Sequence, residues 1–174
     1  IYVNGNFTGS GSQIPEDVQG PITAIIGISS GFIAFTARNA IGASYHAQTI
    51  SSPWVFKEIQ DAGGIESFEQ ATVEGSLGKV MAYTSAGIQT ITLNSAEHAH
   101  PAVSDFITHR QTEQYDFGTH LVSKGDLGSD CFVKLTAVGN RFVVISYGYL
   151  PGLYSYALIY DIALQRWGKV RIRH

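Results

Sequence analysis

Charged residues and cysteine are scarce in this sequence. Its 174 residues include 11 basic and 14 acidic side chains, a formal net charge of −3, and charged residues make up 14%, where about 25% is usual. Lys169, Arg171 and Arg173 alternate on the last predicted strand, which is typical of a protected edge strand. With a net charge of −3 we expect no nucleic-acid partner. The one cysteine, Cys131, excludes an internal disulfide framework. No apolar run approaches the roughly 18 residues that cross a bilayer, so we expect no membrane insertion.

Hydrophobic residues and glycine are plentiful instead. A hydrophobic content of 44% is too high for a disordered chain, and the length suits one domain with a core of its own. The 19 glycines exceed the usual share of about 7% and indicate many tight turns. The chain begins at Ile1 and its one methionine is Met81, so we expect it to be processed or cut from a longer polypeptide.

Apolar and β-branched residues come in short bursts separated by glycine and polar turns, a pattern typical of β-strands. The first group of bursts predicts four strands, at residues 21–28, 32–36, 43–49 and 54–59. Tight turns such as Ser29-Ser30-Gly31 link them. We therefore expect an antiparallel meander in this part of the chain.

The pattern then returns twice, which indicates a repeat. Residues 31–36, 78–84 and 140–146 align, and each segment ends in a hydroxyl residue after an aromatic or aliphatic one. The last unit again predicts four strands, at residues 131–138, 141–147, 154–161 and 167–172.

The middle unit departs from this plan after strands at residues 70–74, 79–84 and 88–93. Val103, Phe106 and Ile107 fall at i, i+3 and i+4, which predicts a short helix over 95–108. Residues 109–130 are polar and irregular, and we expect a long loop there.

Units of about 40 to 60 residues with four short strands are typical of β-propeller blades. We therefore expect an all-β fold, a propeller-like array of about three four-stranded antiparallel blades forming part of a ring. Because known propellers have about four to eight blades, other subunits or the rest of a longer polypeptide would complete it. The units are an N-terminal segment or end of a preceding blade at 1–20, and blades at 21–62, 63–130 and 131–174.

Two resemblances follow from particular phrases. Tyr160-Asp161 followed by Trp167-Gly168 is similar to the turn between the third and fourth strands of kelch-like blades, which implies that this Trp and Tyr pack between neighbouring blades. The chain also resembles propeller-containing virion proteins of tailed bacteriophages, those of the tail nozzle and hub. The phrases that carry this resemblance are residues 31–36, 52–56, 83–88 and 156–161, the helix expected around Pro101, and residues 166–168.

The bacteriophage resemblance implies a virion protein, assembled in the host cytoplasm, that acts by subunit packing without catalysis. Other tail proteins are then its expected partners. A carbohydrate- or receptor-binding propeller that attaches to a host-surface glycan is the alternative, and a propeller-type glycoside hydrolase is a third hypothesis.

Candidate metal ligands are few and badly spaced. His98 and His100 are two residues apart with His109 nearby, but no cysteine or carboxylate set completes four ligands. Oxygen ligands for calcium would come from Asp116, Asp126 and Asp130, without the spacing of an EF-hand. We expect no metal and no cofactor.

Catalytic patterns are equally weak. Glu66, Glu69 and Glu74 are the carboxylates available for a glycosidase pair, but that pair needs a separation of about 5 to 10 Å. No Gly-x-Ser-x-Gly segment occurs. We therefore expect no enzyme activity and no catalytic residues.

Aromatic side chains are the best contact candidates, because rigid aromatics dominate protein interfaces and stack on sugars. Tyr147 and Tyr149 flank Gly148 before a Pro-Gly turn, and the two tryptophans are Trp54 and Trp167. These four residues are the predicted interface.

Overall fold

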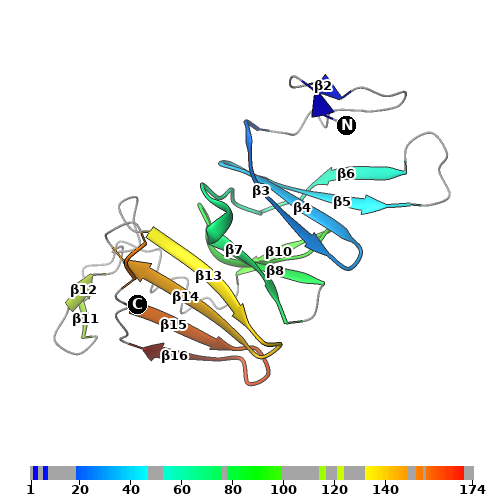
Figure 1. Cartoon of the computed structure of the whole chain (residues 1–174). Helices are drawn as coiled ribbons and strands as arrows, with labels where there is room; N and C mark the ends of the chain where they lie inside the picture. Colours follow the sequence, from blue (N-terminus) through cyan, green and yellow to red (C-terminus); the bar gives the residue numbers. More distant parts are fainter. Residues whose placement is uncertain are drawn as a thin grey trace.

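Three four-stranded antiparallel sheets make up most of the structure, a computed structural model (Figure 1). Backbone and side chains are described for residues 19–46, 53–75, 78–98, 132–148, 152–154 and 156–170, apart from the side chains of Tyr156 and Lys169. For two short hairpins only the backbone is described: β1 (Tyr2–Val3) with β2 (Asn6–Phe7), and β11 (Gln114–Asp116) with β12 (Leu121–Ser123).

Each of the three sheets is a meander in which consecutive strands pair. The first sheet consists of β3 (Ile22–Ile28), β4 (Gly31–Thr36), β5 (Ala40–Tyr45) and β6 (Trp54–Glu58). The second consists of β7 (Ala71–Glu74), β8 (Lys79–Thr84), β9 (Gly87–Ile91) and β10 (Ala96–His98). The third consists of β13 (Phe132–Val138), β14 (Phe142–Gly148), β15 (Tyr156–Asp161) and β16 (Arg166–Val170). The all-β prediction with three four-stranded units is confirmed.

The prediction of a helix over 95–108 is wrong for the first residues of that range. Residues Ala96–His98 form β10, which pairs with β9 as the fourth strand of the second sheet. Residues 99–108 lie outside the described residues. The loop expected over 109–130 contains the β11–β12 hairpin.

Threonine hydroxyls close several of the tight turns. Thr36 Oγ1 accepts hydrogen bonds from the backbone N–H groups of Arg38 and Asn39. Thr84 Oγ1 likewise accepts one from the N–H of Ala86 and lies 3.0 Å from the Gly87 carbonyl. Such side-chain contacts substitute for backbone bonds in a turn and so fix where β4 and β8 end.

The second sheet packs between the other two. Alternate residues of a strand point to opposite faces. Along β8, Val80 and Ala82 join a core with the first sheet, whereas Met81 joins a core with the third. Val80, Met81 and Ala82 are all fully buried. Both faces of the second sheet are therefore interior.

The link from β6 to β7 crosses from the last strand of one sheet to the first strand of the next. It contains a short 3₁₀ turn, η1 (Phe68–Gln70), capped by Ser67. Ile65 N–H donates to the Thr36 carbonyl, and Thr23 Oγ1 donates to the Ile65 carbonyl. The link is thus hydrogen-bonded to the first sheet on its way to the second.

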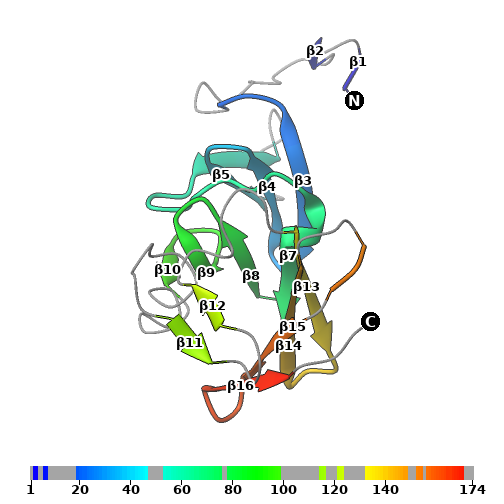
Figure 2. The ribbon, with the colours of Figure 1, turned by 90° about the vertical axis from the view of Figure 1, so that its left-hand side faces the viewer.

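The first strands of the three sheets lie in succession. Contacts join β3 to β7 and β7 to β13, and β8 also touches both β3 and β13. Figure 1 shows β3, β7 and β13 running in the same direction, and Figure 2 shows the three strands following one another from a second side. Within the described residues the sheets do not close into a ring.

Candidate interaction surface

Four aromatic side chains meet on the face of the first sheet that points away from the second sheet. Strand pairing aligns Phe32 with Ala43 and Phe56, and Tyr45 with Trp54. The ring centroids of Phe32 and Trp54 are 5.2 Å apart, those of Phe32 and Phe56 are 6.2 Å apart, and those of Tyr45 and Trp54 are 5.3 Å apart. We call Phe32, Tyr45, Trp54 and Phe56 the aromatic patch.

The aromatic patch is open to solvent on one side. Tyr45 is 56% exposed and Trp54 is 37% exposed. Ile25 lies on the same face, since it pairs with Ala34, and is 60% exposed. This outward surface of the first sheet, its end face, therefore offers bulky apolar side chains.

The third sheet has an end face of its own, on the side away from the second sheet. Its apolar members, assigned by strand register, are Phe132, Val138, Phe142, Val144, Ile159 and Val170. Val138 is 50% exposed. Arg166, the first residue of β16, belongs to this face because it pairs with Asp161 and not with an inward residue. The two end faces thus lie at opposite ends of the succession of sheets.

The other predicted contact residues are not part of the aromatic patch that contains Trp54. Tyr147 is only 3% exposed and belongs to the core between the second and third sheets, so its prediction as a surface contact is wrong. Period-2 alternation with Val143 and Ile145 was the signal that could have placed it inward. Tyr149 lies outside the described residues.

Trp167 also faces inward. Its ring lies 4.8 Å from that of Tyr160, and both pack in the core that includes Met81 of the second sheet. This agrees with the inter-sheet packing that the kelch-like turn implied. The indole Nε1 is buried and finds no acceptor among the described residues.

An ion pair fixes the β15–β16 turn beside the end face of the third sheet. Arg141 donates from Nε and from its terminal nitrogen to Asp161 Oδ2, at 3.0 and 2.8 Å. Asp161 Oδ1 accepts from the N–H groups of Ala163 and Leu164. The hydrogen bond from Arg141 holds the pKa of Asp161 below its ordinary value, because it favours the charged carboxylate.

The glutamates considered for catalysis have separate structural contacts. Glu69, on η1, lies 3.4 Å from Lys134 Nζ and accepts from the Tyr154 hydroxyl. Burial, and then the negative charge of Glu69, raises the pKa of Tyr154. Glu74 accepts instead from the Thr90 hydroxyl, and Glu66 is exposed. Glu69, which is half-buried, and Glu74, which is buried, thus have different polar partners.

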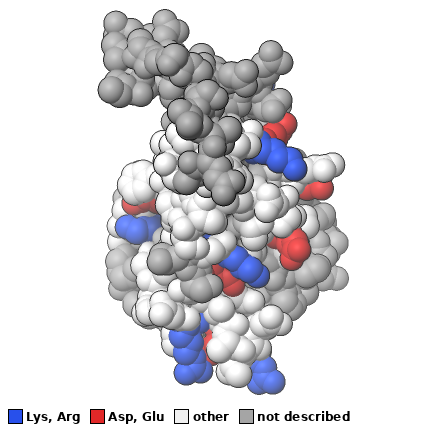
Figure 3. Space-filling view, turned by 90° about the vertical axis from the view of Figure 1, so that its right-hand side faces the viewer, with Lys and Arg blue, Asp and Glu red and all other residues white. Residues whose placement is uncertain are grey.

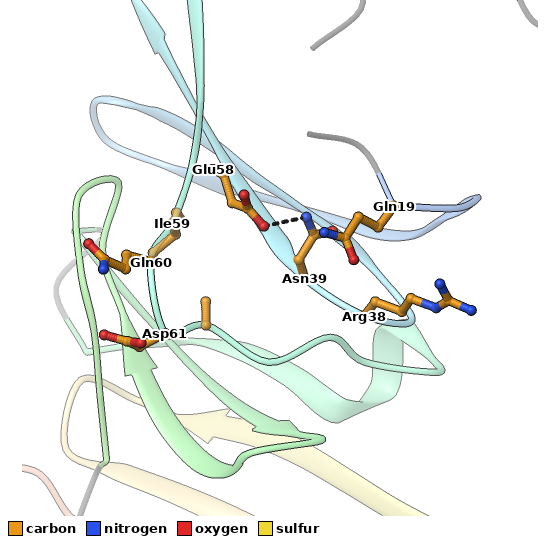
Figure 4. A pocket seen from close by; sticks show the side chains of 8 residues that line it. Gln19, Arg38, Asn39, Glu58, Ile59, Gln60 and Asp61 are labelled. Atoms are coloured by element: carbon orange, nitrogen blue, oxygen red, sulfur yellow. Dashed lines mark hydrogen bonds between the residues drawn. The ribbon is translucent and has the colours of Figure 1, made fainter. Parts of the chain in front are cut away.

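A pocket of about 440 Å³ opens beside the first sheet (Figure 4). At its centre Asn39 Nδ2 donates to Glu58 Oε1 over 2.8 Å, and Arg38 extends away from this pair. The lining residues are Gln19, Arg38, Asn39, Glu58, Ile59, Gln60, Asp61 and Ala62. The described lining residues include no Ser, Cys or His that could act as a nucleophile or imidazole base.

Metal-binding chemistry finds no support in the part of the chain that the structure describes. No group of three or more His, Cys, Asp or Glu side chains there could hold an ion. His98 is exposed on β10. The remaining candidates, His100, His109, Asp126 and Asp130, lie outside the described residues, and of Asp116 only the backbone is described.

Charges of both signs are interspersed on the face of the molecule drawn in Figure 3. Lys and Arg lie near Asp and Glu there, with uncharged surface between them. Helices long and apolar enough to cross a membrane are absent from the described residues. Comparison of the sequence with protein-family models and with curated proteins found no match.

Proposed function

We propose that this chain is a non-enzymatic structural and interaction module, three blades of a β-propeller, that acts in a virion through subunit packing. The observation that carries this proposal is that bulky apolar side chains lie on both end faces, although on the third sheet Lys134, Thr136 and Arg166 also point outward. An antiparallel sheet that borders water usually alternates apolar inward residues with polar outward ones. The first sheet instead places the exposed Ile25 and Tyr45 and the half-buried Phe32 outward. Ile33 and Phe35 point inward.

The connectivity supports the propeller. In a propeller, each blade is a four-stranded meander and blades repeat radially around a central channel. Here each sheet is a meander, the link after β6 returns to a first strand, and the first strands β3, β7 and β13 follow one another. Further sheets packed on the two end faces would continue the same arrangement.

The virion role rests on the resemblance to tail nozzle and hub proteins of tailed bacteriophages. Several of the phrases that carry it fall on strands: residues 31–36 are β4, and residues 156–161 are β15. A tail protein acts by rigid contact, which suits a chain with bulky apolar side chains on both end faces. Other tail proteins, or further sheets of the same polypeptide, are the partners that this function requires.

Photo-cross-linking inside the particle tests the proposal. Benzoylphenylalanine replaces Tyr45 on the first end face in particles that contain this chain, and replaces exposed Phe68 on η1 as the control. We expect a cross-link from position 45 to another protein segment that position 68 does not give. Absence of this chain from purified particles would contradict the virion role.

A carbohydrate- or receptor-binding propeller is the second candidate, favoured by the exposure of Tyr45 and Trp54. Sugars stack on flat, open ring faces. The planes of the Tyr45 and Trp54 rings are inclined by 66° and those of Phe32 and Trp54 by 53°, which makes a ridged surface better suited to interleaving side chains. Strong glycan-array binding that Trp54→Ala removes would favour this candidate over the structural one.

A further inference from the structure

We draw no further inference here: the strongest candidate, the pocket between the β4–β5 turn and the link that leaves β6, indicates no class of ligand, because Asn39 and Glu58 are hydrogen-bonded to each other and Arg38 extends away from this pair (Figure 4).

Discussion

Gln89 is the buried polar side chain on which the junction of the first two sheets depends. It is 1% exposed. Its Nε2 donates to the Asp61 carbonyl over 2.7 Å, and its Oε1 accepts from the Gly63 N–H over 2.9 Å. The Thr84 hydroxyl is a further donor to Oε1. Gln89→Leu keeps much of the volume and removes all of these bonds.

The expected loss of stability depends on which hydrogen bonds each partner of Gln89 can still make after the substitution. The Gly63 N–H is buried and would lose its acceptor, which costs about 1–3 kcal/mol. Asp61 is exposed, so its carbonyl can turn to water and loses only about 1 kcal/mol, the net value of one hydrogen bond. Thr84 Oγ1 can donate to the Gly87 carbonyl instead, at 3.0 Å. We therefore expect a loss of about 2–4 kcal/mol in the free energy of unfolding.

Urea unfolding followed by tryptophan fluorescence measures this loss. Gln60→Leu is the matched control, because Gln60 is exposed in the same link, and surface changes usually stay within about 0.5 kcal/mol. Gln89→Leu should lower the urea midpoint with little change in slope. A Gln89→Leu midpoint equal to that of the control would refute the view that this amide holds the link in place.

Three further predictions concern packing and pH. Met81→Ala should cost about 2–5 kcal/mol, measured by urea unfolding, because Met81 is fully buried between the second and third sheets. Gly64→Ala should destabilise strongly, since a Cβ there would lie 2.2 Å from the backbone of the β4–β5 turn, whereas Gly27→Ala, with open space around it, should be tolerated in the same thermal melts. The lowered pKa of Asp161 means that its pairing with Arg141 stabilises the fold fully above about pH 4 and is lost as the pH falls through that lowered pKa. The difference in melting temperature between wild type and Asp161→Asn should therefore shrink as the pH falls below about 4, and a difference that stays constant as the pH is lowered would contradict this role.

Strands with strong β-propensity were predictable from the sequence. β4 (Gly31–Thr36), β8 and β14 follow β-branched or aromatic bursts that end at turn residues, and each lies where its burst predicted it. The hydroxyl residues that align in the sequence do not all have the same structural role. Thr36 and Thr84 close turns, but Ser146 lies inside β14 and pairs with Ala157.

β10 was missed because its residues have weak strand propensity. Ala and Glu favour helices, and the apolar spacing further along the chain reinforced a helical interpretation. What makes Ala96–His98 a strand is pairing with β9, in which Ala96 lies opposite Ile91. A local signal was available in Thr92, whose hydroxyl accepts from the N–H of Asn94 and of Ser95. This is the same threonine turn that ends β4 and β8, and it marks a further hairpin.

Exposure of the candidate contact residues could not be read from their type alone. Tyr147 and Trp54 are both aromatic and both lie on strands, yet one is in a core and the other on an end face. What separates them is which face of which sheet they occupy, and that depends on the order in which the sheets stack. Periodicity gives the side of a strand, but only the packing of β8 against both neighbours identifies which side is the interior.

The second sheet shows what a sheet with two interior faces looks like in this fold, and the outward faces of the other two sheets can be compared with it. It is interior on both faces because Val80 and Met81, adjacent on β8, enter different cores. The first sheet would need polar residues outward to be the last member of a stack in water, but its outward rows contain Ile25, Phe32 and Trp54. Ile25 is 60% exposed, so Ile25→Asp should leave the folding of the isolated chain nearly intact while weakening association, because exposed side chains contribute little to the monomer. If Ile25→Asp instead lowered the unfolding free energy of the monomer by several kcal/mol, the end face would be part of this chain's own core and not a surface for a partner.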